Sequence, residues 1–344
     1  MEPAAALRRI AFLLERSADP GYRATAFRKA ATAVAAVPGE QLAALAATGS
    51  IRTIPGLGES TAKVVMEALA GKTPAYLEKL EAKADPGVLA LEGAAAGLRS
   101  ALRGDCHTHS DWSDGGATIE EMAIAARDLG HAYIVLTDHS PRLTVARGLS
   151  PERLREQLEV VARLNERLAP FRILTGIEVD ILDDGELDQD DDLLEQLDVV
   201  VASVHSKLRM GGAEMTRRMC NAIANPHMDI LGHCTGRMKT AGKDRPPSEF
   251  DPDFVFHACL MFDKAVEINS RYERLDPPPE LLAKAVDVGC RFSIDSDAHA
   301  PGQLAWLPNG CEMAATAGLG PDRIVNTLEI DELLAWTRSH SADA

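Results

Sequence analysis

The sequence lacks the features that mark a membrane-bound or secreted protein. Charged residues interrupt its apolar runs well before the roughly 18 residues that a membrane helix needs. The first residues, MEPAAALRRI, have no basic head, apolar centre and cleavage site. Six cysteines are scattered along the chain without any C-x-x-C spacing, so neither a disulfide framework nor a zinc ribbon is predicted. We therefore expect a cytoplasmic protein with reduced cysteines and no membrane contact.

Basic residues are also too few for a protein that coats nucleic acid. The 344 residues carry a net charge of −16, whereas binding to phosphates by bulk electrostatics needs a basic surface. Residues 1–100 hold 12 Lys and Arg against 10 Asp and Glu, a net charge of +2 that leaves −18 for the other 244 residues. Since single cores usually stop growing near ~250–300 residues, we expect a small, nearly neutral domain followed by a large acidic one.

Residues 1–80 have the pattern of a small helical domain. Apolar residues recur at three- and four-residue intervals from Leu7 to Val37, which is helical spacing. The stretch TIPGLGESTAKVVMEAL predicts a tight turn at Gly56-x-Gly58 and a helix that starts directly after it. The first amides of such a helix point at any nearby anion, so the turn predicts a phosphate contact. An ordinary helix–turn–helix with a glycine cap fits the same spacing.

From Gly104 onward, short apolar runs alternate with helical segments, which is the pattern of a parallel α/β fold. Seven runs have the length of strands: 103–107, 132–137, 172–179, 197–203, 228–232, 265–269 and 290–295. Seven strands fit a closed barrel better than a two-layer sheet. We therefore predict a (β/α) barrel behind the small helical domain.

Each predicted strand ends in polar residues. In chain order these are His107 and His109, Asp138 and His139, Glu178 and Asp180, His205, His233, Asn269, and Asp295, Asp297 and His299. Six of the ten histidines belong to this set, and the carboxyl ends of barrel strands meet in one mouth. Imidazole and carboxylate suit zinc, manganese and iron, and a carboxylate can bridge two cations. Because residues i and i+2 of a strand point the same way, His107 and His109 are expected to bind one metal ion together.

The first hundred residues resemble a known DNA-binding domain. The stretches YRATAFRKAATAV, IPGLGESTAKVV and GKTPAYLEKL are similar to the helix-hairpin-helix domain at the amino end of family X DNA polymerases, including DNA polymerase β. The resemblance implies that this domain binds the DNA backbone, with Gly56, Gly58 and Lys63 at the contact. Some members form a Schiff base through a lysine six residues after the second hairpin glycine. Here that position is Val64, which argues against abasic-site lyase activity.

The second region resembles the polymerase and histidinol phosphatase (PHP) domain, in the form appended to bacterial family X polymerases. The matching motifs cover most of residues 100–340 and are His107-x-His109, SDG at 113–115, TDHS at 137–140, GIEVDIL at 176–182, SVHS at 203–206, GHCTGR at 232–237, EIN at 267–269 and SDAH at 296–299. The resemblance implies a distorted (β/α)7, TIM-like barrel that holds three divalent metal ions, which are zinc, manganese or iron.

The same resemblance implies which residues bind each ion. The implied sets are His107, His109, Glu178 and Asp297 for the first ion, Glu178, His205 and His233 for the second, and Asp114, His139 and His299 for the third. Asp114 stands where some phosphatase relatives have histidine, so the third set departs from the family pattern.

Four basic residues follow the implied ligands along the chain: Lys207, Arg209, Arg237 and Arg271. They are candidates for contacts to a substrate phosphate, with Arg237 preferred, and surface salt bridges are the alternative. Neighbouring metal ions lower the pKa of a bridging water to near neutrality. The expected chemistry is therefore hydrolysis of a phosphoester by a hydroxide that bridges the ions.

The order of the domains indicates the substrate. The hairpin domain (1–80) is followed by a linker (81–100) and the barrel (101–340), and no polymerase palm with paired aspartates fits between them. We therefore predict a DNA-directed phosphoesterase, acting as a 3′–5′ exonuclease or a 3′-end repair enzyme. Two alternatives are a phosphatase of a small phosphomonoester such as histidinol phosphate, and a DNA-binding module without catalysis.

Overall fold

The chain folds into two units, residues 1–90 with 300–303 and residues 91–299 with 304–344. The computed structural model describes the chain except for residues 18–20, 84–90, 241–243 and 343–344. The linker predicted at 81–100 therefore lies in part outside the described residues.

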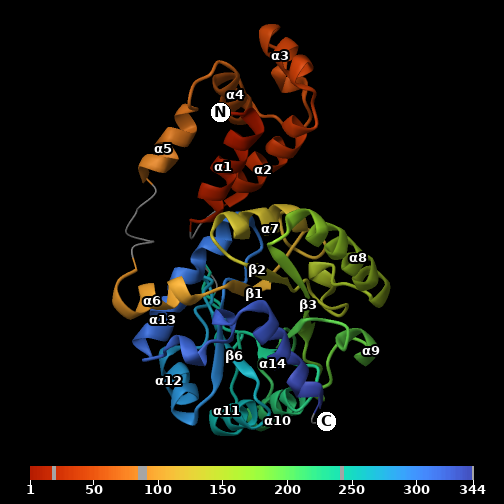
Figure 1. Cartoon of the computed structure of the whole chain (residues 1–344), viewed down its shortest axis with the longest axis vertical. Coiled ribbons are helices and arrows are strands. Elements are labelled where there is room, and N and C mark those ends of the chain that lie inside the picture. The colour runs from red at the N-terminus through yellow and green to blue at the C-terminus, as the bar shows by residue number, and fades with distance from the viewer. Residues whose placement is uncertain (18–20, 84–90, 241–243, 343–344) are drawn as a thin grey trace. The chain divides into compact units, whose positions relative to one another are not determined.

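The first unit is all helical (Figure 1). Its elements are α1 (Pro3–Glu15), α2 (Gly21–Ala35), α3 (Gly39–Ala47), the 3-10 turn η1 (Ile51–Thr53), α4 (Glu59–Leu69) and α5 (Ala75–Lys83). Apolar residues at helical spacing form one core, in which Leu7, Ile10, Val34, Val65 and Leu77 are buried. The small helical domain predicted from the spacing of apolar residues is therefore present.

The glycine turn lies directly before α4, as predicted. Gly56 has a φ of +86°, a conformation that glycine adopts without steric cost. Gly58 is the N-cap of α4, and its N–H donates to Thr61 Oγ1 at 2.9 Å. Val64 is 1% exposed within the core of the unit, whereas the side chain of Lys63 is 71% exposed. Position 64 therefore serves packing in this chain, in accord with the absence of a lysine there.

The second unit is built on a seven-stranded parallel sheet in the order β1-β2-β3-β4-β5-β6-β7. The strands are β1 (Gly104–Thr108), β2 (Tyr133–Leu136), β3 (Arg172–Asp180), β4 (Val199–Ser203), β5 (Ile230–Leu231), β6 (Ala265–Asn269) and β7 (Arg291–Asp295). Every predicted strand is present and shifted by no more than two residues at its start. The predicted seven-stranded barrel is confirmed.

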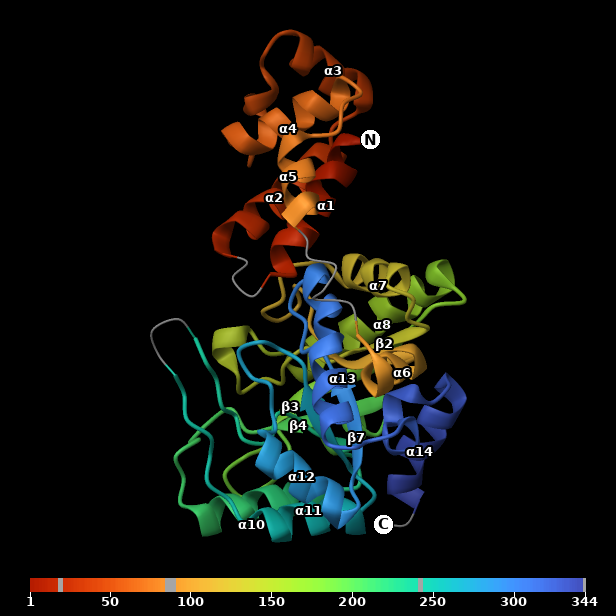
Figure 2. The same ribbon diagram turned by 90° about the vertical axis from the view of Figure 1, so that its left-hand side faces the viewer.

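Helices surround the strands of this unit, and α10, α11 and α12 lie side by side in both views (Figures 1 and 2). The helices are α6 (Gly93–Ala101), α7 (Ile119–Asp128), α8 (Pro151–Leu168), α9 (Asp191–Leu194), α10 (Gly212–Ile223), α11 (Pro252–Met261), α12 (Pro279–Val288), α13 (Leu307–Thr316) and α14 (Ile330–Ala342), with 3-10 turns η3 (Thr144–Ala146), η4 (Pro301–Trp306), η5 (Pro321–Arg323) and η6 (Val325–Thr327).

Taken singly, the described helices are too short or too polar for a membrane span. Among the described residues, no single helix is long and apolar enough to cross a membrane. One pair, Tyr22–Ala35 and Gly39–Ala47, meets the criteria of length and composition only when its two helices are taken together across a bend of 112°.

Strand side chains alternate between the inside of the barrel and the surrounding helices. Tyr133 and Val135 of β2 share an apolar cluster with residues of β1, β3, β4, β5 and β6, which places that cluster inside the barrel. Ile134 and Leu136 pack instead against residues of α7 and α8. This two-residue period is what strand geometry dictates. Inner-facing side chains at the carboxyl end of each strand therefore lie at the barrel mouth.

Strand β1 departs from regular pairing. Its register with β2 shifts between Asp105 and Thr108. Cys106 faces the apolar cluster inside the barrel, yet His107 also reaches an inner carboxylate, with its Nδ1 2.7 Å from Glu267 Oε1. An irregularity of this kind re-aims side chains locally. It allows both His107 and His109 to point toward the mouth.

The barrel is closed by Asn326 in η6. This fully buried amide donates from Nδ2 to the carbonyls of Gly104 in β1 (3.1 Å) and Ile294 in β7 (2.7 Å), and its Oδ1 accepts from the Ile294 N–H (3.1 Å). One side chain therefore satisfies backbone groups of both the first and the last strand. A single parallel bridge, Thr108 with Ala298, joins the same two segments nearer the mouth.

We predict that Asn326→Ala lowers the free energy of unfolding of the second unit by about 2–4 kcal/mol, because it strips partners from buried backbone groups that cost about 1–3 kcal/mol each when unsatisfied. Denaturant unfolding followed by tryptophan fluorescence measures this, since Trp112, Trp306 and Trp336 all lie in this unit. The control Gln196→Ala removes an exposed amide and should change stability little. Equal stability of the two variants would contradict the closing role of Asn326.

Candidate metal centre

One buried carboxylate lies at the middle of the barrel mouth. Glu178 is on the inner face of β3, two residues before the strand ends, and is 1% exposed. Nitrogens of five imidazoles lie 2.8–3.6 Å from its oxygens: His107, His109, His139, His205 and His233. These histidines follow or end β1, β2, β4 and β5. The predicted convergence of strand ends is therefore present around Glu178.

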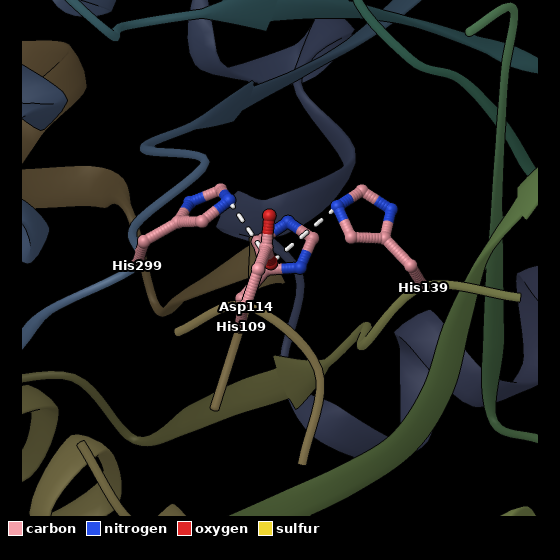
Figure 3. Close-up of side chains that lie close together, drawn as sticks. All are labelled: His109, Asp114, His139 and His299. Carbon is pink, nitrogen blue, oxygen red and sulfur yellow. Dashed lines mark ion pairs between the residues drawn. The ribbon is translucent and has the colours of Figure 1, made fainter. Parts of the chain in front are cut away.

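The other candidate ligands adjoin this carboxylate. Asp297 Oδ1 lies 3.4 Å from His109 Nε2 and 3.5 Å from His299 Nδ1. Asp114 Oδ1 lies 3.6 Å from His139 Nε2 and 3.4 Å from His299 Nε2. In Figure 3, His139 and His299 flank Asp114, and His109 is close to it. All nine residues proposed from the sequence thus belong to one continuous cluster.

Three groups within the cluster have ligand atoms close enough to share a cation. They are His109, Asp114, His139 and His299; His107, His109 and Asp297; and His139, Glu178 and His205. The group His107, His109 and Asp297 lies within the first predicted set, and the group with Asp114 contains the whole third set together with His109. The group His139, Glu178 and His205 shares Glu178 and His205 with the second predicted set but has His139 in place of His233. Two residues bridge the groups, because His109 belongs to two of them and His139 approaches both Asp114 and Glu178.

The donor atoms fit metal ions. The five imidazole nitrogens that face Glu178, and Glu178 Oε1 itself, are buried and have no hydrogen-bond partner among the described residues. Buried polar atoms are ordinarily hydrogen-bonded, so six that face one another indicate a position for positive charge. Imidazole and carboxylate are the ligands of zinc, manganese and iron in proteins.

A second layer of carboxylates orients the imidazoles. Glu267, on the inner face of β6, accepts from the His233 backbone N–H and lies 2.7 Å from His107 Nδ1. Asp180 lies 3.6 Å from His205 Nδ1 and accepts from the His205 backbone N–H at 3.0 Å. Carboxylates in such positions fix the ring orientation of metal-binding histidines. Sequence reasoning missed this role for Glu267. The two-residue period of β6 places Glu267 on the same inner face as Ala265.

The charges of the cluster compensate one another. Burial raises the pKa of Glu178, but the imidazoles of His107, His205 and His139 lower it to a net value well below the ordinary one. Burial lowers the pKa of His139, yet Glu178 and Asp114 raise it to about 10. Burial and the neighbouring His299 lower the pKa of His109 to about 3. Protons on some imidazoles therefore balance the carboxylates where cations are absent, and bound cations would displace those protons.

Two arginines reach the cluster from the loop after β6. Arg271 Nη1 lies 3.5 Å from Asp297 Oδ1, and Arg274 Nε donates to Asp297 Oδ2 at 2.9 Å. Arg274 is 8% exposed, and its Nη1 has no hydrogen-bond partner among the described residues. The sequence predicted Arg271 and missed Arg274, which lies in an irregular loop where no periodicity indicates side-chain direction.

Of the remaining predicted phosphate contacts, Arg237 and Lys207 have other partners, whereas Arg209 is exposed and makes no hydrogen bond or ion pair among the described residues. The Arg237 guanidinium donates to the backbone carbonyls of Arg274 (2.8 Å from Nε) and Leu275, so it supports the loop that carries Arg274. Lys207 Nζ is paired with Asp183 Oδ2. Direct contact of either residue with a substrate stays a prediction.

The loop that carries Asp114 is held by a buried network. Asp138 accepts from the Ser110 N–H and Oγ–H, the Ser113 Oγ–H and Gln157 Nε2. Arg147 donates to the Ser113 carbonyl from the opposite side. Asp138 was singled out only as a polar strand end, and the structure shows it in a supporting position instead.

Two known domain families match this chain. Residues 105–244 match the PHP domain family, and residues 1–74 match a helix-hairpin-helix domain family. Among solved structures, the histidinol phosphate phosphatase of Lactococcus lactis, complexed with zinc, L-histidinol and phosphate, has a TM-score of 0.43 and 17% identity, covering 63% of this chain and 94% of its own.

Curated relatives are more similar in sequence. The DNA polymerase/3′-5′ exonuclease PolX of Bacillus subtilis is 38% identical over 237 residues, which are 69% of this chain and 41% of that protein. The chain thus spans less than half the length of this relative. A probable phosphatase of Thermoanaerobacter sp. is 31% identical over 235 residues, which are 65% of this chain and 89% of that protein. The chain belongs to the PHP domain family, and its N-terminal region in addition matches a helix-hairpin-helix domain.

Proposed function

We propose that the chain is a metal-dependent phosphoesterase that acts on DNA, as a 3′–5′ exonuclease or a 3′-end repair enzyme. The observation that carries the proposal is the set of five imidazoles that converge on the buried carboxylate of Glu178. The similarity to a protein named as a 3′-5′ exonuclease supports the choice of DNA. A cytoplasmic location stays a prediction from the sequence.

We assign three divalent ions, zinc, manganese or iron, to the cluster. The first would be held by His107, His109, Glu178 and Asp297, the second by Glu178, His205 and His233, and the third by Asp114, His139 and His299. Bound divalent ions in such sites activate water and stabilise the charge that develops on phosphoryl oxygens. The unpaired nitrogens around Glu178 support this assignment.

The side chains of the chain itself have separable tasks in this proposal. Glu267 holds the His107 ring through its 2.7 Å contact with Nδ1, and Asp180 positions the backbone of His205 by accepting its N–H. Arg274 directs its unpaired Nη1 from a buried position beside Asp297, where a guanidinium can bind a phosphoryl oxygen. Arg271 is positioned to do the same from a less buried site on the same loop.

The hairpin domain supplies the argument for a polymeric substrate. The second unit carries most of the negative charge of the chain, so it repels a DNA backbone at long range. The open turn before α4 presents helix N-terminal amides to an anion. A small phosphomonoester needs no such contact, and a chain that acted only on one would leave this unit without a task.

A phosphatase acting on a small monoester is the second candidate. It is favoured by the relatives named as probable phosphatases, one of which matches 65% of this chain over 89% of its own length. A non-catalytic DNA-binding module is the third possibility, and metal binding without any hydrolysis would support it.

The central test is metal-dependent cleavage of a labelled DNA strand. Purified protein with manganese should shorten the strand, and His107→Ala should reduce the rate by more than about 100-fold, since even a residue that only supports a metal ligand contributes 10- to 100-fold. The matched control is His257→Ala, which removes an exposed histidine on α11. Activity that survives in the His107→Ala protein would point to a contaminating nuclease.

The orienting carboxylate gives a separate prediction. Glu267→Gln should weaken metal binding about 10- to 100-fold, because the amide orients the His107 ring less strongly than a carboxylate does. Isothermal titration of metal-stripped protein with zinc or manganese measures the change. Glu280→Gln, an exposed substitution on α12, is the control. Unchanged affinity in the Glu267→Gln protein would show that Glu267 does not support the centre.

The hairpin can be tested in the full chain. A Cβ atom added at Gly58 or at Gly39 meets no atom within 4 Å, so both positions have room for a side chain to leave the backbone. Gly58→Leu should lower kcat/KM on DNA about 10-fold, which corresponds to the loss of a charge-assisted hydrogen bond of about 1.5 kcal/mol, and should leave turnover of a small phosphomonoester unchanged. Gly39→Leu should change neither. Equal effects of the two variants on DNA would contradict the hairpin's role.

A further inference from the structure

A pocket of about 650 Å³ is lined by the loops that follow β3 and β4 and by helix α10. Ligand pockets commonly have volumes of roughly 300–1,000 Å³. Its lining combines cationic side chains with two carboxylates and one amide: Lys207, Arg209, Arg217, Asp184, Glu214 and Asn221. None of these residues belongs to the candidate metal ligands.

The walls of the pocket begin at the metal centre. Lys207 comes two residues after His205, a separation that spans at most about 7 Å. Asp183, which also lines the pocket, comes three residues after Asp180, whose carboxylate accepts the His205 N–H at 3.0 Å. Two of the loops that line the pocket therefore start at residues that belong to or support the metal centre.

Arg218 forms a fixed support beneath both walls. It is 1% exposed, and its guanidinium donates to the Ile181 carbonyl after β3 (3.0 Å from Nε) and to the Ser206 carbonyl after β4 (2.9 Å from Nη1). Ile181 follows Asp180 and Ser206 follows His205 directly in the chain. The pocket is thus attached to the centre by buried hydrogen bonds, and its geometry follows that of the metal ligands.

Two guanidinium groups in the pocket are available to a ligand. Arg209 and Arg217 are exposed, and neither makes a hydrogen bond or an ion pair within the described part of the chain. The carboxylate of Asp183 is already balanced, because Lys207 is paired with it and Arg218 Nη1 lies 3.9 Å away. Two planar, unpaired cations on one pocket are suited to the oxygens of a phosphodiester.

We propose that this pocket is a nucleotide subsite, which binds the nucleotide next to the scissile phosphate. Arg209 and Arg217 contact the phosphate of that nucleotide, while Asp184, Glu214 and Asn221 face the hydrogen-bonding edge of its base, since carboxylates and carboxamides accept from or pair with base edges. The inference rests on the proposed action on DNA. It specifies that the substrate is a strand with a further nucleotide beyond the bond that is cleaved.

The test compares substrates with and without that nucleotide. The full chain carrying Arg209→Ala and Arg217→Ala is assayed with manganese on a single-stranded oligonucleotide and on bis(p-nitrophenyl) phosphate, a diester that contains no nucleotide. We expect kcat/KM on the oligonucleotide to fall at least about 10-fold and hydrolysis of the small diester to stay within twofold. The slope of log kcat/KM against log salt should become shallower by about 0.7 for the lost phosphate contact.

A second measurement does not depend on catalysis. Fluorescence anisotropy of a labelled oligonucleotide should show weaker binding to the double variant by a similar factor. The matched control carries Arg155→Ala and Arg163→Ala, which remove the same charge from exposed positions on α8, and it should behave like the wild-type protein.

The outcomes separate this inference from the proposed function. A wild-type chain that hydrolyses the small diester but neither binds nor cleaves DNA overturns both. If the wild-type chain cleaves DNA and the Arg209/Arg217 variant does so equally well, only the subsite is overturned. The subsite is also overturned if the variant loses activity on both substrates equally, or if the α8 control loses as much activity on DNA.

Discussion

The structure of the second unit depends on the burial of one carboxylate. Glu178 is almost fully withdrawn from solvent, and an isolated buried charge of this kind costs far more than a folded domain has in net stability. The surrounding imidazoles, contributed from the ends of four other strands, compensate that charge. This compensation requires that the carboxyl ends of all those strands lie at the same end of the barrel. A parallel barrel has this arrangement because all its strands run in the same direction. The fold and the chemistry of the mouth are therefore two aspects of one electrostatic requirement.

In the proposed function, the two units divide the work of recognising a phosphate polymer. The acidic barrel concentrates carboxylates where cations are needed, and this composition is unfavourable for long-range attraction of DNA. The helical unit is almost neutral and offers backbone amides rather than a basic surface. Such contacts are short-ranged and depend on shape, so they suit a protein that engages one end of a strand better than one that coats it. The similarity to part of a longer polymerase is compatible with this division, because the helix-hairpin-helix match ends at residue 74 and the PHP match begins at residue 105.

Sequence reasoning recovered the strands and the ring of candidate ligands because both follow from simple periods. Apolar runs bounded by turns located β1 to β7, and the rule that strand ends converge then brought Glu178, His205, His233 and Asp297 together. The sequence did not indicate Arg274 or the closing role of Asn326, since both lie in irregular segments whose direction is set by tertiary contacts. The support given by Arg218 was equally hidden, because an arginine on an amphipathic helix is ordinarily expected to face solvent.

The closure of the barrel by Asn326 also governs when the centre can form. Its hydrogen bond to Gly104 joins positions 222 residues apart, and the Cys106 N–H donates to Asp295 across 189 residues. Contacts of such long range are made late in folding, after the loop entropy of the intervening chain has been lost. During synthesis on the ribosome, His107 and His109 emerge long before Asp297 and His299. A nascent chain therefore carries only an incomplete centre, and the full set of candidate ligands comes together only when the last strand has docked.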